Sequence, residues 1–542
     1  MTNNILWWQR GVVYQIYPRS FMDSNGDGIG DLRGVMERLD YLAWLGIDAI
    51  WFSPIFPSPM ADFGYDVSDY VNIHPDFGTL EDFDLLLEEA HKRGLKILLD
   101  LVPNHTSSEH AWFKESRSSR DNPKRDWYIW RDPAADGGPP NNWLAYFGGP
   151  AWTLDEASGQ YYMHNFLPEQ PDLNWRNPEM VAAMLESIRF WLRRGVDGFR
   201  IDVIHCIIKD DQFRDNPVNP GYSPGDLSYT AQKRIYSESR PEAHEYVRMI
   251  RAAFNEFDER VSIGEIDYFL PLDQLMAYYG VLDATGAGDE LHLPFNFKLL
   301  VTPWDAKSVR THVDEYNGAI PTHGWPNYVM GNHDYMRVAT RVGQAQARVA
   351  AMLLLTLRGT PTIYYGDELG MQNVEIPPEK LQDPWGINIP GMSRDPVRTP
   401  MQWDEAPNGG FSAEGVETWL PLALNYANVN VGSLESDPTS ILSLFRRLLA
   451  YRREIPALHA GSYQPIDTTG DTYAYIRQDG EQKRLVALNF TGAPITLDLS
   501  AAGMAKGKVV ISTMMDGSQS APREVTLTAV SLRANEGVII EV

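Results

Sequence analysis

The sequence of 542 residues contains a single cysteine, Cys206, and no long hydrophobic run. One thiol cannot form an intrachain disulfide, which agrees with the cytoplasmic location that we expect. No stretch of about 18 apolar residues is present, so we predict no transmembrane helix. The N-terminal residues also lack the basic stretch and apolar core of a secretory signal peptide.

Positive charge is also scarce. The 47 Lys and Arg residues stand against 72 Asp and Glu residues, for a net charge of −25. This balance argues against a nucleic-acid backbone or an anionic membrane surface as a partner, and it is compatible with a neutral substrate. Aromatic residues are plentiful, with 16 Trp and 26 Tyr, and such rings serve either in the core or against sugar faces. A monomer and a homodimer are both compatible with the sequence.

One local plan recurs along the chain: a helix that ends at glycine, then an apolar strand, then polar residues. Helical patterns over residues 32–45, 80–93 and 178–194 are each followed by such a strand. Helix and strand alternating through very short turns indicate a parallel sheet. No GxGxxG or GxxxxGK motif follows any strand, which weakens a nucleotide-binding alternative. The eight predicted strands favour a (β/α)8 TIM barrel over an open doubly wound sheet, and they lie near residues 12, 49, 97, 199, 262, 293, 329 and 363.

Three segments depart from the alternation. Residues 105–174 are rich in Pro, Gly and Trp, and we predict an inserted subdomain after the third strand. Residues 370–439 form a second long insertion after the eighth strand. From residue 460 to 542 short alternating strands predict a C-terminal all-β sandwich domain. The barrel would then comprise residues 1–104 and 175–459.

Charged residues follow the apolar strand at residues 198–201. Arg200 and Asp202 share one face of this strand, which on its own fits either a structural ion pair or a catalytic site. In a barrel, chemistry lies at the C-terminal ends of the strands. Carboxylates and histidines from several strands meet there, which favours catalysis. The side chains predicted at this mouth are Asp100, Asn104, His105, Arg200, Asp202, Glu265, Asn332, His333 and Asp334.

A possible metal loop follows the first strand. The segment DSNGDGIGD, residues 23–31, places an oxygen at every second residue. Such spacing suits a hard cation, Ca²⁺ or Mg²⁺, held for structure, and an Asp- and Gly-rich turn without metal is the alternative. Gly34 stands where an EF-hand would have its twelfth-position Glu. The predicted ligands are Asp23, Asn25, Asp27, the carbonyl of Ile29, and Asp31.

Several motifs together resemble the α-amylase family of glycoside hydrolases (family 13), in its α-glucosidase and oligo-1,6-glucosidase branch. They occur in family order and span the chain almost to the predicted C-terminal domain. The matching stretches are GVVYQIYPRSF, DLVPNH (100–105), QPDLNW (170–175), GFRIDVIH (198–205), GEI (264–266), GNHD (331–334), GTPTIYYGDELG (359–370) and RDPVRTPMQW (394–403). The resemblance implies the same barrel, an inserted domain after strand three and a C-terminal β-sandwich.

The resemblance also implies roles. Asp202 would be the nucleophile, Glu265 the general acid/base and Asp334 the transition-state stabiliser of a retaining mechanism. Arg200, close to Asp202, should favour the ionised nucleophile. Substrate-binding roles are implied for His105, His333 and Arg200 as donors to the sugar, Asp62 and Arg398 as the pair that grips the non-reducing-end glucose, Tyr65, Phe147 and Phe166 at its ring, and Val203 in linkage preference.

The function that we expect is a retaining exo-acting α-glucosidase on short α-glucosides of the maltose, isomaltose, sucrose or trehalose type, with transglucosylation as a side reaction. The alternatives are an oligo-1,6-glucosidase, or a sucrose isomerase or trehalose synthase, which share the catalytic residues. A polymer-cutting α-amylase and a non-catalytic transporter partner fit less well, since the residues of a closed pocket and the catalytic residues are all present. Departures from the branch pattern at His205 and at Tyr335–Arg337 bear on acceptor and linkage preference rather than on the chemistry.

Overall fold

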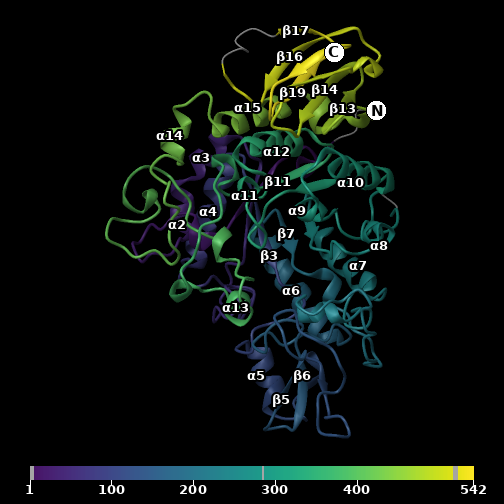
Figure 1. The fold of residues 1–542 in the computed structure, drawn as a ribbon. Coiled ribbons are helices and arrows are strands. Elements are labelled where there is room, and N and C mark those ends of the chain that lie inside the picture. The colour runs from purple at the N-terminus through teal and green to yellow at the C-terminus, as the bar shows by residue number, and fades with distance from the viewer. Residues whose placement is uncertain (1–4, 284–285, 517–522) are drawn as a thin grey trace.

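Eight parallel strands form a nearly closed barrel at the centre of the molecule (Figure 1). The structure is a computed structural model that describes residues 5–283, 286–516 and 523–542; the other positions of the predicted domain ranges lie outside the described residues. The strands follow in the order β10-β11-β1-β2-β3-β7-β8-β9, which confirms the predicted barrel. Their bounds are β1 (Val13–Ile16), β2 (Ala49–Phe52), β3 (Lys96–Leu101), β7 (Gly198–Ile201), β8 (Val261–Gly264), β9 (Leu293–Pro294), β10 (Asn327–Val329) and β11 (Thr360–Tyr364).

The seam between β9 and β10 is bridged by a side chain. β9 has only two residues, and Pro294 lacks the N–H that a ladder needs. The amide of Asn327 donates to the Pro294 carbonyl at 2.5 Å, and its oxygen accepts from the Asn296 N–H at 2.9 Å. Asn327 therefore supplies the hydrogen bonds that the short strand cannot make.

Helices surround the barrel and are set by local capping signals. Before β7, Asn177 caps the first turn of α6 and Gly195 ends it with a φ of 110°, the left-handed conformation expected there. The predicted helix over 32–45 is interrupted at Arg38, whose backbone leaves the helical region while its guanidinium lies 4.4 Å above the ring of Trp403. The principal helices are α2 (Leu32–Glu37), α3 (Leu39–Leu45), α4 (Leu80–Lys92), α6 (Pro178–Arg194), α7 (Ala243–Phe254), α8 (Leu272–Ala277), α10 (Ala306–Ala319), α12 (Gln344–Thr356) and α15 (Ile441–Glu454). No helix in these described ranges is long and apolar enough to cross a membrane.

Two excursions leave the barrel, one after β3 and one after β11. The first, within residues 105–174, carries α5 (Ala111–Ser118) and a three-stranded antiparallel sheet, and it projects from the barrel at the lower end of Figure 1. The second follows β11 and includes α13 (Pro384–Asn388) and α14 (Val431–Glu435). The sheet of the first excursion consists of β4 (Trp130–Arg131), β5 (Trp152–Asp155) and β6 (Gln160–Met163).

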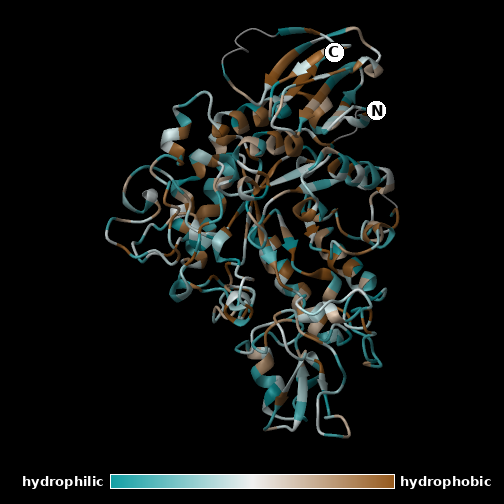
Figure 2. Cartoon of the chain, viewed as in Figure 1, coloured by the Kyte–Doolittle hydropathy of each residue, from teal (hydrophilic) through white to brown (hydrophobic). Residues whose placement is uncertain are grey.

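The C-terminal domain has a six-stranded antiparallel sheet with two different buried faces. Tyr473 and Val486 join the barrel core, whereas Ala474 and Leu485, one residue away, face a separate core closed by a two-stranded sheet. Figure 2 shows hydrophobic residues concentrated in this sheet and in the helices beneath it. The sheets are β12 (Ser462–Ile466), β13 (Thr472–Asp479), β14 (Gln482–Asn489), β19 (Gly537–Glu541), β16 (Lys506–Ser512) and β17 (Arg523–Thr526), with β15 (Ile495–Leu497) paired to β18 (Val530–Leu532).

A half-buried histidine of α10 makes stability depend on pH. Burial, helped by the charge of Lys298, lowers the pKa of His312 to about 4, while its Nε2 donates to the Asn296 side chain at 3.0 Å. Below pH 6.5 the unfolded chain therefore binds more protons here than the folded chain, and stability falls as the pH falls toward 4. Between pH 7 and pH 5 the free energy of unfolding of the wild type should therefore fall. We expect this fall to be about 2 kcal/mol smaller in His312→Gln, which keeps a hydrogen-bond donor but does not titrate.

Urea unfolding at both pH values measures this difference. A replacement of the half-buried His323, whose Nε2 lies 3.2 Å from the Gly280 carbonyl, would serve as a control if the stability that it lost between these pH values matched the loss of the wild type. Equal losses in wild type and His312→Gln would contradict the assignment.

Candidate active site

A cavity of about 660 Å³ opens at the carboxyl ends of the barrel strands. Barrel residues form its floor, the 105–174 excursion supplies one wall, and Trp385 and Arg394 of the 370–439 segment supply another. Two predicted residues, Arg200 and Arg398, are each 1% exposed and lie beneath the floor. The other predicted catalytic and substrate-binding residues all line the cavity: Asp62, Tyr65, His105, Phe147, Phe166, Asp202, Val203, Glu265, His333 and Asp334.

One guanidinium joins the two carboxyls predicted to react. Arg200 at the end of β7 contacts Asp202 at 2.7 Å and, through its other terminal nitrogen, also contacts Glu265 after β8. The neighbouring register of β7 and β8, with Ile201 opposite Gly264, brings these two carboxyls together. On its buried side Arg200 also holds Asp100 of β3 at 2.9 Å.

This crowding of carboxyls changes their proton affinity. Burial raises the pKa of Asp100 to about 7, against the pull of Arg200. Burial also raises the pKa of Asp202, and the charges of Glu265 and Asp100 add to it, although Arg200 opposes the shift as the sequence led us to expect. Burial and the mutual repulsion of the carboxyls therefore both oppose full ionisation of Asp100 and Asp202, and Arg200 counteracts them.

The residue after Asp202 has a strained backbone. Val203 adopts a φ of 32°, a left-handed conformation that is rare for a β-branched residue. Its N–H donates to the Glu265 carboxyl at 3.3 Å, and its side chain lines the cavity. The strain thus places a backbone donor against the predicted acid/base.

Asp334, predicted as the stabiliser, is held as an anion. Arg398 contacts it at 3.1 Å, Arg394 at 3.3 Å and His333 at 3.3 Å. Although burial raises the pKa of Asp334, the charges of His333, Arg394 and Arg398 outweigh burial and hold it well below the usual range. Burial lowers the pKa of His333 itself to about 3, so at neutral pH the two arginines supply the compensating charge.

The predicted pair Asp62 and Arg398 do not contact each other directly. Arg398 binds Asp334 and the His333 carbonyl, whereas Asp62 contacts Arg394 at 2.8 Å. Arg394 also binds Asp383, the N-cap of α13, at 2.6 Å. Arg394 and Asp383 were not selected from the sequence, although Arg394 opens the RDPVRTPMQW motif from which Arg398 was chosen.

The remaining predicted donors are neutral and oriented. Burial lowers the pKa of His105 to about 4, and its Nε2 lies 3.1 Å from the Tyr65 carbonyl. The Tyr65 ring stacks on His333 at 5.5 Å with an interplanar angle of 3°, and its hydroxyl lies 2.7 Å from His333 Nε2. Phe147 and Phe166 meet at 5.9 Å on the cavity wall. These rings and imidazoles form an aromatic lining on the cavity.

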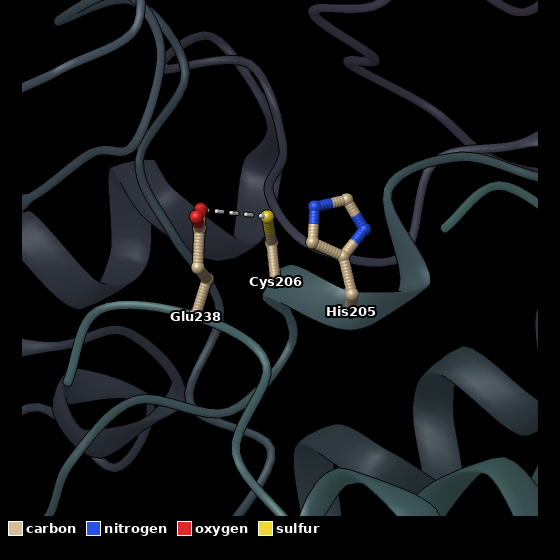
Figure 3. Close-up of side chains that lie close together, drawn as sticks. All are labelled: His205, Cys206 and Glu238. Carbon is tan, nitrogen blue, oxygen red and sulfur yellow. Dashed lines mark hydrogen bonds between the residues drawn. The ribbon is translucent and has the colours of Figure 1, made fainter. Parts of the chain in front are cut away.

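The part of the cavity beyond Glu265 holds a second buried polar cluster. Glu238 binds Arg234 at 2.9 Å and accepts from the Tyr146 hydroxyl at 2.7 Å. His205 and Cys206 follow Val203 in a short 3-10 turn, and Cys206 lies between His205 and Glu238 (Figure 3). Arg234 and Glu238 come from a segment without strand or α-helix periodicity, so nothing in the sequence marked them.

The predicted metal loop has oxygens suited to a hard cation, but it is also stabilised without one. Asp23 accepts the N–H groups of Gly26 and Gly28 at 2.7 and 2.8 Å, and Asp31 caps α2. The Ile29 carbonyl accepts no hydrogen bond from any described residue, so it is available to a cation. The three loop carboxylates do not form a group with all ligand atoms within 4.8 Å; among the described residues only His205, Cys206 and Glu238 do.

Comparison with known proteins places these features in context. The family model of the alpha amylase catalytic domain matches residues 15–461. A probable alpha-glucosidase of Rhizobium meliloti (strain 1021) is 44% identical over 511 residues, covering 91% of each chain. An oligo-1,6-glucosidase of Parageobacillus thermoglucosidasius is 38% identical over 525 residues, covering 90% of this chain and 91% of that one. The crystal structure of an alpha-glucosyl transfer enzyme has a TM-score of 0.91 at 42% identity, over 99% of this chain and 100% of the other.

Proposed function

Because the chain belongs to the α-amylase family of glycoside hydrolases, as its motifs predicted, we propose that it is a retaining exo-acting α-glucosidase. It would release glucose from the non-reducing end of short α-glucosides, with transglucosylation as a side reaction. The observation that carries the proposal is the contact of one buried guanidinium, that of Arg200, with both Asp202 and Glu265 on the floor of the cavity.

The two carboxyls would act by double displacement. Asp202 attacks the anomeric carbon while Glu265 gives its proton to the leaving glycosidic oxygen, and a covalent glucosyl–Asp202 ester forms. Glu265 then takes a proton from water, which attacks the same carbon and frees glucose with retained configuration. Asp334, kept anionic by Arg394 and Arg398, would stabilise the positive charge of the oxocarbenium-like transition state. A sugar hydroxyl in place of water gives transglucosylation.

The closed end of the cavity supports exo action. Asp62 and Arg394 form a buried ion pair there, and Trp385 and Phe147 cover it with ring centroids 5.5 Å apart. A terminal glucose would present its hydroxyls to these charges, whereas a longer chain could not pass through. The observation therefore favours single-glucose release over internal cleavage of a polymer.

Negative charge on the side of the cavity opposite the Asp62–Arg394 pair favours neutral leaving groups. Glu238 and Asp267 line the cavity beyond Glu265, and the nearby Arg234 is already paired with Glu238. A phosphorylated leaving group would meet these carboxylates without a free cation among the described lining residues. We propose unmodified α-glucosides as the substrates.

The test is a rate comparison on maltose, isomaltose, trehalose and sucrose with product analysis. We expect glucose as the main product, and NMR should show the α-anomer first. Internal cleavage of starch would overturn exo action, and an isomerised disaccharide as the main product would favour the isomerase alternative.

Val203 provides a prediction about linkage preference. Its apolar branched side chain lines the cavity next to both reacting carboxyls. We expect Val203→Thr, which keeps the β-branch and replaces a methyl by a hydroxyl, to lower the isomaltose-to-maltose ratio of kcat/KM by up to about tenfold. An unchanged ratio would remove Val203 from the account of specificity.

We further propose that the 23–31 loop binds Ca²⁺ or Mg²⁺ through Asp23, Asn25, Asp27, Asp31 and the Ile29 carbonyl. The free carbonyl and the all-oxygen set support it. A hundredfold excess of ion over Kd stabilises a fold by about 2.7 kcal/mol, so chelation should lower Tm by a few degrees. Asp27 is exposed and bonds only the Ile29 N–H, so Asp27→Ala should remove the response at little other cost. A wild type that melts identically with and without chelator would exclude a bound ion.

A cytoplasmic location is proposed from the single cysteine, which a reducing compartment would leave as a thiol. Cell fractionation with an antibody against the chain tests it, and recovery in the exported fraction would overturn it.

A further inference from the structure

Two polar atoms on the cavity wall beyond Glu265 have no hydrogen-bond partner among the described residues. They belong to His205 and Glu238, side chains of residues that are only 4% and 6% exposed. The His205 side chain makes one weak contact, from Nδ1 to the Glu265 carbonyl at 3.5 Å, and its Nε2 makes no hydrogen bond with the described residues. The three contacts of Glu238 all use Oε2, which leaves Oε1 free.

The surrounding cluster fixes both side chains. Arg234 at 2.9 Å, the Tyr146 hydroxyl at 2.7 Å and the Cys206 thiol at 3.8 Å all hold Glu238 Oε2. Burial raises the pKa of Glu238, but the charges of Arg234 and His205 and the Tyr146 hydrogen bond bring it below its ordinary value. Glu238 is therefore an anchored anion with one oxygen left for an outside donor.

A metal ion is a poor occupant of this cluster. His205, Cys206 and Glu238 do offer ligand atoms within 4.8 Å of one another (Figure 3). Burial, however, raises the pKa of the Cys206 thiol well above its usual range, so the thiolate that a metal would bind is disfavoured. The guanidinium of Arg234 already compensates the charge of Glu238.

The topology places the pair on the leaving-group side of the scissile bond. Asp62 follows β2 and Arg394 follows β11, both neighbours of β1, and they close the glucose end. His205 and Glu238 follow β7 on the far side of the barrel, where Glu265 must protonate the leaving oxygen. Groups beside Glu265 on this side are placed to meet the second sugar.

Resting on the proposed α-glucosidase activity, we propose that His205 Nε2 and Glu238 Oε1 form a donor–acceptor pair that recognises a hydroxyl of the leaving or acceptor sugar. A hydroxyl both donates and accepts, so it can satisfy a charged carboxylate oxygen and an imidazole N–H at once. An aryl leaving group has no such hydroxyl. The pair would therefore favour sugars over aryl groups on this side, and sugar acceptors over water.

The test compares two substrates that share the glucosyl half. For each variant we would measure kcat/KM for the best disaccharide of the panel and for p-nitrophenyl α-glucoside, and take the ratio. Loss of one hydrogen bond, about 1.4 kcal/mol, should lower the ratio about tenfold in His205→Ala and in Glu238→Gln. His205→Asn, which keeps an N–H donor, should recover part of it. Partial misfolding of a variant lowers kcat/KM for both substrates by the same factor, so it does not change their ratio.

Cys206→Ala is the matched control, because Cys206 belongs to the same cluster but does not line the cavity. Its ratio should equal that of wild type. Transfer products at high disaccharide concentration should fall relative to free glucose in His205→Ala and Glu238→Gln, but not in Cys206→Ala. The proposed role of the pair would be overturned if the disaccharide-to-aryl ratio were unchanged in both His205→Ala and Glu238→Gln, or if it fell equally in Cys206→Ala. A wild type without activity on either substrate would instead overturn the proposed function.

Discussion

Asp202→Asn is expected to lower kcat on aryl α-glucosides by at least about 10⁴-fold while the fold is retained. An amide cannot form the glucosyl ester, and no second described carboxyl can replace it, because Glu265 must remain free to protonate the leaving oxygen. Asparagine is nearly isosteric with aspartate. Its amide oxygen can keep the contact with Arg200, whose guanidinium lies 2.7 Å from the Asp202 carboxylate in the wild type. Steady-state rates with circular dichroism and a melting curve measure both halves of this expectation.

Asp100→Asn is a matched control for this experiment. Asp100 contacts the same guanidinium at 2.9 Å but is 1% exposed and does not line the cavity. Its replacement should cost far less in kcat. Because the charge of Asp100 contributes to raising the pKa of Asp202, its removal should also move the acid limb of kcat/KM to lower pH. Near-normal rates in Asp202→Asn, or equal losses in the two variants, would refute the nucleophile assignment.

The fold followed from signals that are local in sequence. Glycines such as Gly195 mark the ends of helices, and the apolar run after such a glycine marks a strand. The strands of the barrel could therefore be counted from the sequence before their arrangement was known. β9 was the weakest case, because only Leu293 and Pro294 pair and a side chain of β10 completes the seam. Long-range compensation of that kind has no local pattern.

The site residues that directly follow a barrel strand could be predicted from the sequence. Those that lie in long loops folded back over the cavity could be predicted less completely. Asp202 and Glu265 sit at strand ends, so the barrel rule places them at one mouth. Arg394 and Glu238 lie in long irregular segments, and their positions depend on how those segments fold back over the cavity. The sequence also predicts Arg200 as the tuner of Asp202, but the net pKa shift depends on burial, which only the structure gives.

Glu265→Gln is expected to lower kcat/KM on disaccharides by about 10³-fold, and much less on substrates with good leaving groups. A sugar leaving group needs a proton on its oxygen, whereas a dinitrophenolate departs without one. Glutamine keeps the size of the side chain. Its amide oxygen can still accept from the Val203 N–H, which lies 3.3 Å from the Glu265 carboxylate in the wild type. The dependence of rate on leaving-group pKa should therefore become steep in the variant and remain shallow in wild type.

Azide separates this role from that of Asp202. In Glu265→Ala, azide needs no general base and should intercept the covalent intermediate from the face that water uses, giving α-glucosyl azide. In Asp202→Ala, azide would enter the space of the missing nucleophile and give the β-anomer. NMR of the two products assigns each carboxyl by stereochemistry and not only by loss of rate. The same anomer from both variants would mean that the two roles are wrongly divided between Asp202 and Glu265.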